Sequence, residues 1–300
     1  MIATLAGMMA PADAARRGQL LCAAAAIVWS SAGPVQRAVD ATSVTQVSVR
    51  AGVGAASLLA WILLRRRRGT LAAFVSVGRA GLIVAVSLAI VSSVFIFALA
   101  HTSVAHVLLF QAASPFVAAL LAWILMREYI PPRTWMAMGA ALVGVAIMVG
   151  GSLDGGSLWG DVLCIVMSTG FAVVIVITRR HREISMTPAT ALGMAIAFVA
   201  TAPFSTLSGV SGRDIFLLAA LGAGQTALGL ILFTAGARLI PAAQAGLITL
   251  LEVVLGPLWV WLIYREEPDA ATIVGGSVIV AAVLLHALSE LRPSAVRATV

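Results

Sequence analysis

Long apolar runs separated by short polar connections cover almost the whole chain. A continuous apolar run of about 18 or more residues is typical of a transmembrane helix. A transmembrane barrel would instead show alternating segments of about ten residues, and helices satisfy their backbone groups internally in lipid. The pattern predicts ten transmembrane helices, over residues 18–38, 41–64, 79–100, 103–126, 132–150, 158–178, 187–208, 214–237, 241–264 and 270–288.

The composition supports this interpretation. Apolar residues make up 61% of the chain and charged residues only 10%, whereas a soluble domain carries about 25% charged residues. Too few polar side chains are present to cover a globule, so the outer surface must face lipid. The connections are also too short to hold a soluble domain. The predicted fold class is therefore an all-α polytopic membrane protein.

The charge distribution predicts the orientation in the membrane. All 19 basic residues are arginine, and the formal net charge is +7. Fifteen arginines fall on the side of the N-terminus, three (Arg37, Arg213 and Arg265) on the other side, and Arg50 within a helix. The positive-inside rule then places residues 1–17 and 289–300 in the cytoplasm as tails. Because the arginines gather in short loops, we expect no nucleic-acid partner. The expected location is the inner (plasma) membrane.

One hexapeptide pattern occurs twice. WILMRE at Trp123–Glu128 and WLIYRE at Trp261–Glu266 lie almost half a chain apart and end the fourth and ninth predicted helices. Five helices separate the two copies. Because five is odd, the second copy must cross the membrane in the opposite direction.

Two further pairs keep the same order. Gly-x-x-Leu-Cys opens the first helix at Cys22 and the sixth at Cys164, and His106 and Gln244 are separated by the same spacing as the two hexapeptides. The sequence therefore predicts two inverted five-helix repeats, over residues 18–150 and 158–288. Secondary transporters commonly have this architecture, with the substrate site near the midplane between the halves.

The first repeat resembles a known family. FALAHTSVAHVLLFQAASPFVAALLAWILMREYIPP, followed by MGAALVGVAIMVGG, is similar to the EamA repeat of the drug/metabolite transporter superfamily, through Ala98, Leu99, Pro115, Glu128, Gly139 and Gly144. Arg50 also stands where the family often has an arginine. The second copy is looser: Glu252 and Glu266 fit, but Val253 stands where proline is usual.

This resemblance implies a secondary carrier that works by alternating access. The chain is similar to ten-helix exporters of amino acids and related metabolites, and export of aromatic amino acids is the preferred hypothesis. The implied partners are a small-molecule substrate and the lipid bilayer, and a monomer is expected. An exporter of cationic drugs is the alternative within the superfamily, and a receptor or a lipid-handling enzyme is the alternative outside it.

The motifs of other chemistries are missing from the sequence. It has no glycine-rich phosphate loop with lysine, no HExxH and no paired acidic metal motif. Two cysteines, both in apolar runs, support neither a disulfide framework nor a cysteine zinc site. We therefore expect no enzymatic activity, no cofactor and no metal.

Two charged residues, Arg50 and Glu252, lie near the middle of predicted helices. Charges in a membrane are costly and usually face a partner or a water-filled cavity. Arg50 could contact a substrate carboxylate, or anchor Glu252 or helix-end carbonyls. Glu252 could bind a substrate ammonium, carry a proton, or form a structural pair.

The other candidates for the cavity are polar or aromatic residues in apolar helices. The residues Gln244, Ile248 and Glu252 recur at helical spacing on the ninth helix, and His106 and Phe110 form a similar stripe on the fourth, with Gln111 beside it. Interhelical hydrogen bonding is the alternative role for the polar residues, and packing is the alternative for an aromatic residue. The predicted substrate-binding set is Trp29, Arg50, His106, Phe110, Gln111, Gln225, Gln244, Ile248 and Glu252.

Overall fold

The computed structural model describes residues 11–32, 35, 38–66, 69–102, 104–150, 158–265 and 267–291, and helices account for all of its regular structure there. Within this part of the chain, nine helical segments are long and apolar enough to cross a membrane. The first long helix stands outside the nine because Asp13, Arg16 and Arg17 fall in its opening turns. The all-α membrane class is thus confirmed.

The helices follow the predicted segments, with several divided. In chain order they are α2 (Pro11–Ser30), α4 (Ser43–Arg66), α5 (Thr70–Ser76), α6 (Gly78–His101), α7 (Val104–Met126), α8 (Pro132–Val149), α9 (Leu158–Arg180), α10 (Thr187–Thr201), η3 (Ala202–Phe204), α11 (Gly212–Ala220), η4 (Leu221–Leu228), α12 (Gly229–Ala237), α13 (Ala242–Thr249), α14 (Leu251–Tyr264) and α15 (Ala270–Leu291). The eighth predicted helix is α11–η4–α12 and the ninth is α13–α14. The short α5 lies in a stretch where no helix is predicted.

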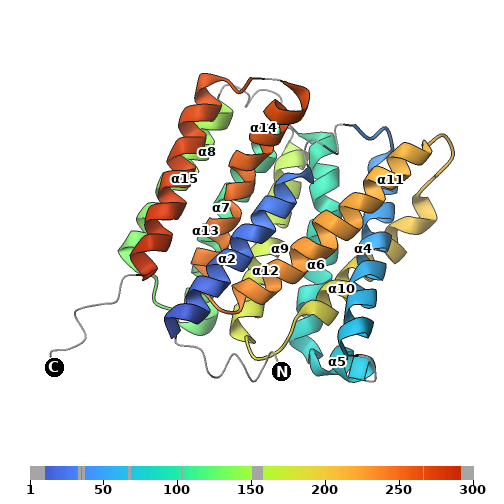
Figure 1. The fold of residues 1–300 in the computed structure, drawn as a ribbon, viewed down its shortest axis with the longest axis horizontal. Helices are drawn as coiled ribbons and strands as arrows, with labels where there is room; N and C mark the ends of the chain where they lie inside the picture. The colour runs from blue at the N-terminus through green and yellow to red at the C-terminus, as the bar shows by residue number, and fades with distance from the viewer. Residues whose placement is uncertain are drawn as a thin grey trace.

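The long helices run up and down between two ends of the bundle (Figure 1). We call the lower end in Figure 1, where α2 begins and α15 ends, the proximal end, and the opposite end the distal end. Helices α4, α7, α9 and α12 finish at the proximal end, and α14 finishes at the distal end.

Contacts between the helices of the two halves come in matched pairs. Helix α8 packs on α15, α4 on α10, and α7 on α13, each against its own counterpart. The contact of α6 with α9 is matched by that of α12 with α2, and α7 with α9 by α13 and α14 with α2. The contact of α6 with α10 is matched by that of η4 with α4. The two halves therefore make equivalent contacts on each other.

The repeated hexapeptide forms the same helix end twice. Arg127 and Arg265 both have left-handed backbones, with φ of 52° and 60°. Each backbone N–H donates to the carbonyl of the tryptophan four residues earlier, Trp123 or Trp261, at 2.9 Å. This is a helix C-cap in which glycine is the more usual residue. The two caps lie at opposite ends of the bundle (Figure 1).

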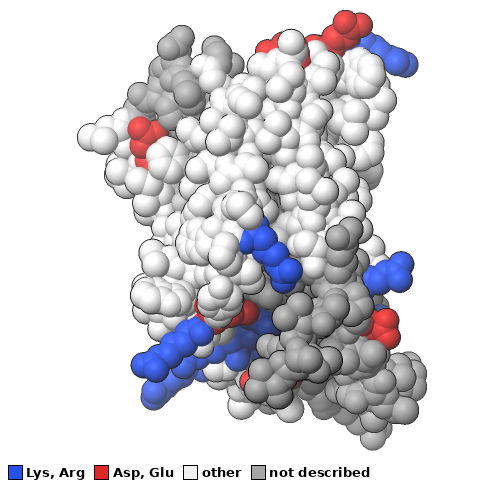
Figure 2. Space-filling view, turned by 90° about the vertical axis from the view of Figure 1, so that its left-hand side faces the viewer, with Lys and Arg blue, Asp and Glu red and all other residues white. Residues whose placement is uncertain are grey.

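The side surface of the bundle suits lipid. Figure 2 shows a broad uncharged surface in the upper half of the molecule, between a few charged residues at the distal end and the larger number of basic side chains in the proximal half. Large apolar side chains such as Leu64 and Leu285 are exposed in these helices. An apolar belt of this extent is a surface for the hydrocarbon core of a bilayer.

The α8–α15 contact provides a test of this packing. A Cβ on Gly144 would lie 2.7 Å from the carbonyl oxygen of Gly275 and 2.8 Å from Ile279, whereas a Cβ on Gly139 would meet no atom within 4 Å. We expect Gly144→Ala to destabilise the protein by about 1–3 kcal/mol, the usual range for overpacking. Gly139→Ala, the control on the same helix, should be neutral or stabilise by up to about 1 kcal/mol. Thermal unfolding in detergent measures both, and equal effects would contradict the contact.

Candidate functional site

A cavity of about 890 Å³ lies in the middle of the bundle and extends to the distal end. We call it the central cavity. Side chains from both halves line it, from α2, α4, α6, α7, α9, α10, η4, α12 and α14. Its distal mouth is formed by Glu267, Pro268, Asp269 and Thr272. The wall is mostly apolar with a few polar groups, which is the usual character of a small-molecule site.

Arg50 is the cationic group of the cavity. It lies on α4, is 9% exposed, and donates from Nη2 to Oε1 of Gln225 at 3.0 Å. The hydroxyl of Thr226 donates to the same oxygen at 3.2 Å. Both neighbours also line the cavity. The guanidinium is therefore held against the wall by an amide of the other half.

A distortion of the eighth helix places this amide. Residues 221–228 form a π-helical stretch, η4, and such stretches are frequent at functional sites. Helix α4 approaches closely here, because a Cβ on Gly222 would lie 2.7 Å from the carbonyl oxygen of Arg50. Glycine at this position lets the two backbones meet, and the wider turn that follows presents Gln225 to Arg50.

Glu252 supplies the acidic group of the cavity. The ninth helix is interrupted at Leu250, and Glu252 stands in the first turn of α14, the half-helix that follows. Ser114 precedes Glu252 by the spacing of the two hexapeptides and is thus its counterpart in the first repeat, and it also lines the cavity.

An aromatic cluster forms part of the cavity wall. The rings of Trp29 and Phe171 meet edge to face at 5.9 Å, and Phe233 lies 5.2 Å and 5.3 Å from them. The indole of Trp29 packs directly on Gly229. Trp29 and Phe171 both line the cavity, and their separation along the chain equals that of Cys22 and Cys164. The cavity thus has repeat-related aromatic side chains meeting between the halves.

The structure brings together five of the predicted site residues in this cavity, namely Trp29, Arg50, Gln111, Gln225 and Glu252. Phe110 and Ile248 do not line it. Phe110 packs with Ala98 and Cys164, and Ile248 is 2% exposed within the main core.

The stripe predicted on the ninth helix is divided between two pockets because its ends, Gln244 and Glu252, lie about 12 Å apart along the helix axis. Helix α13 packs on α7, where Gly246 meets Pro115, and on α2 and α9, whereas α14 alone lines the central cavity. Gln244, on α13, therefore lies below the cavity and lines a second, smaller pocket at the proximal end. His106 is in α7, but its side chain lies outside the described part of the structure.

Several residues of the cavity wall were missed by the sequence analysis. The whole contribution of α6, including Val91, Ser92 and Phe95, carries no charged or strongly polar marker. Phe171 and Ser114 could have been found, because the repeat separations point from Trp29 and Glu252 to them.

The distal mouth of the cavity carries two acidic residues, Glu267 and Asp269, and a hydrogen bond links two of the helices beside it. The indole N–H of Trp259 on α14 donates to the hydroxyl of Ser30 on α2 at 2.8 Å. Asp269 caps α15, accepting the backbone N–H of Thr272 at 2.7 Å. Hydrogen bonds from the Thr272 side chain and backbone hold the pKa of Asp269 below its usual value, so this carboxylate stays charged at neutral pH.

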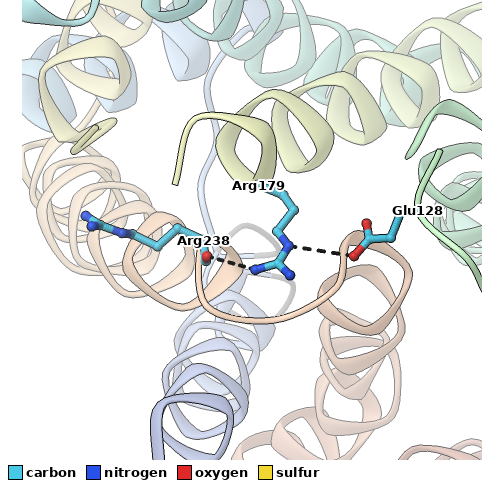
Figure 3. A network of polar contacts seen from close by, with 3 residues as sticks. All are labelled: Glu128, Arg179 and Arg238. Carbon is cyan, nitrogen blue, oxygen red and sulfur yellow. Dashed lines mark hydrogen bonds and ion pairs between the residues drawn. The ribbon is translucent and has the colours of Figure 1, made fainter. Parts of the chain in front are cut away.

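The proximal end is closed by arginines (Figure 3). Nε of Arg179, at the end of α9, lies 3.7 Å from Oε1 of Glu128, and its Nη1 donates to the carbonyl oxygen of Arg238 at 3.1 Å. Beside it, Nη1 of Arg180 donates to the carbonyl oxygen of Leu125 at 3.2 Å. Cations at a helix C-terminus are favourable, so α9 holds the end of α7 from the opposite half.

Comparison with known proteins assigns the fold and the class. The EamA-like transporter family model matches the chain twice, over residues 16–150 and 158–288. An uncharacterized transporter of Archaeoglobus fulgidus is 24% identical over 192 residues, 64% of this chain and 70% of the relative. A solved structure described as "Crystal structure of protein" superposes with a TM-score of 0.76 at 18% identity, covering 91% of this chain and 98% of the other. At that identity the superposition shows the fold alone.

Proposed function

Because the chain belongs to the EamA-like transporter family, it is a membrane transporter and not an enzyme, and we propose that it exports amino acids and related small metabolites. Aromatic and apolar amino acids are the preferred substrates. The protein works as a secondary carrier by alternating access in the inner (plasma) membrane, as a monomer. The substrate-binding residues are those of the central cavity, with Arg50 and Glu252 as the charged pair.

The presence of both charges in one apolar cavity carries this proposal. Arg50 from the first half and Glu252 from the second line the same space. An amino acid is a zwitterion. Its carboxylate, directed to Arg50, and its ammonium, directed to Glu252, would neutralise the charges of these two side chains. The remaining wall, with Trp29 and Phe171, offers aromatic surface to an apolar side chain. A further charged group on the substrate would lose its hydration shell, and the cavity wall has few polar groups to replace those water contacts.

The architecture supports alternating access. We propose ten transmembrane helices, with α2 as the first, in two inverted five-helix halves over residues 18–150 and 158–288. The matched contacts between halves and the helix caps at opposite ends support this arrangement. In such carriers the halves rock around a site at their interface. With the cavity reaching the distal end and arginines closing the proximal end, the structure corresponds to the outward-open state if the tails are cytoplasmic.

The orientation gives a prediction of its own. A single cysteine at Glu267, at the distal end, should react with an impermeant thiol reagent added outside intact cells. A cysteine at His181, in the proximal connection after α9, should react only after the membrane is opened. Both are made in a Cys22→Ala, Cys164→Ala background, because these two cysteines are free. The reverse pattern would place the tails outside.

Transport into proteoliposomes tests the proposal. The purified protein should take up radiolabelled phenylalanine and leucine in exchange for the same amino acid inside, and should transport lysine and glutamate at least about tenfold more slowly. Uptake confined to lipophilic amines would favour the cationic-drug alternative, which Glu252 and the acidic mouth support. Exchange of no amino acid in the panel would refute the proposal.

A further inference from the structure

A second pocket lies at the proximal end, away from the central cavity. Its volume is about 220 Å³, which is room for about seven water molecules at roughly 30 Å³ each. Glu128 and Ile130 from the connection after α7, Gln244 from α13 and His286 from α15 line it. Both halves therefore contribute to this space, which we call the proximal pocket.

Two polar side chains of the proximal pocket have unused hydrogen-bonding atoms. Gln244 is 2% exposed, and its Nε2 has no hydrogen-bond partner among the described residues. Oε2 of Glu128 is also buried and likewise has none in that part of the chain. A buried polar atom without a partner costs about 1–3 kcal/mol. Both atoms are buried behind the pocket wall, so a polar ligand in the pocket satisfies them when these two lining side chains turn toward it.

A ligand that satisfies both side chains must carry one hydrogen-bond acceptor and one hydrogen-bond donor. The Gln244 amide can donate to a carboxylate, and the Glu128 carboxylate can accept from an ammonium. These are the two groups of an amino acid head. We propose that the proximal pocket is a loading site on the cytoplasmic side that binds the ammonium and carboxylate of a small amino acid before it reaches the central cavity. This inference rests on the proposed function, because it assumes the same substrate class.

The site is linked to the closure of the proximal end. Oε1 of Glu128 lies 3.7 Å from Nε of Arg179, while Oε2 of the same carboxylate is buried without a partner among the described residues. An ammonium at Oε2 competes with Arg179 for the same carboxylate charge, which weakens the hold of α9 on the end of α7. Binding at the proximal pocket therefore favours opening of the proximal end.

The sequence repeats this pair of charges. Arg37 precedes Arg179 by the spacing of the two cysteines, and Glu266 follows Glu128 by the spacing of the two hexapeptides. Those two positions lie outside the described residues, so the proposal is confined to the proximal pair.

Equilibrium binding of radiolabelled L-alanine to the purified protein tests the site. We expect two molecules per chain. Gln244→Leu should remove one, Glu252→Gln should remove the other, and the double variant should bind none. Gln19→Leu is the matched control, because Gln19 is also buried with an unpartnered Nε2 among the described residues but does not line the proximal pocket. It should bind two.

The outcomes separate this inference from the proposed function. One molecule bound, lost in Glu252→Gln and kept in Gln244→Leu, would mean that the proximal pocket holds only water, and would overturn the inference alone. One molecule lost in Gln244→Leu and kept in Glu252→Gln would support the inference and remove the central site. No binding at all would contradict both.

A further variant tests the link to Arg179. In the Glu252→Gln background only the proximal site remains, and adding Arg179→Gln should then tighten L-alanine binding about five- to tenfold, because the ligand no longer competes with the guanidinium. Unchanged or weaker binding would show that Arg179 and the ligand do not share Glu128.

Discussion

Replacing Glu252 by glutamine is expected to reduce uptake of phenylalanine at low concentration by about 10- to 100-fold, and Arg50→Gln should have an effect of the same size. Each change removes one charged contact to the substrate, and hydrogen bonds to charged groups contribute about 1.5–3 kcal/mol. A difference of about 1.4 kcal/mol corresponds to a factor of ten in affinity. Initial rates in proteoliposomes, corrected for the amount of folded protein, measure both effects.

Truncated ligands assign the two charges separately. Phenethylamine lacks the carboxylate, and phenylpropionate lacks the ammonium. We expect Arg50→Gln to weaken inhibition by phenylpropionate and to leave inhibition by phenethylamine nearly unchanged. Glu252→Gln should do the opposite. If both variants lost both inhibitors equally, the two residues would act through folding or cavity shape and not by contact with the substrate head.

The second large effect concerns the aromatic wall. Trp29→Ala is expected to raise the KM for phenylalanine and tryptophan by about 5- to 30-fold, which corresponds to about 1–2 kcal/mol of lost aromatic and apolar contact. For alanine, whose side chain is too short to reach the ring, the change should be less than about threefold. Phe171→Ala should show the same selectivity, because its ring meets that of Trp29 between the halves.

The control for this series is Trp123→Ala. Trp123 is 60% exposed on the outer surface of α7 and does not line the central cavity, so its loss should leave both KM values unchanged. An equal loss of transport for alanine and phenylalanine in Trp29→Ala would show that Trp29 supports packing alone.

The sequence predicts the membrane class, because length and hydrophobicity determine which segments can span a bilayer. It does not predict where a helix breaks. Nothing in Thr249–Glu252 distinguishes the interruption before α14 from a continuous helix, and straight continuation puts Gln244, Ile248 and Glu252 on one stripe. Because Glu252 lies about 12 Å beyond Gln244 along the helix axis, the first lines the central cavity and the second the proximal pocket.

The sequence predicts those residues of the site that carry a charge or a bulky ring within an apolar helix. Arg50, Glu252 and Trp29 have such a signal, whereas Ser92 on α6 does not. The partner of Arg50 was also beyond the sequence, since Gln225 is far along the chain and meets it through the π-helical η4. Phe171 was accessible in principle, because it follows from Trp29 by the repeat separation that relates the two cysteines.

Accessibility of the central cavity from each side of the membrane tests the proposed carrier most directly. A single cysteine in place of Ser92, which lines the cavity and is partly exposed, is made in the cysteine-free background and reconstituted. We expect an impermeant thiol reagent to label it from the distal side at rest, and from the proximal side as well when phenylalanine is present on both sides. Labelling from the distal side alone under every substrate condition would contradict alternating access through this cavity.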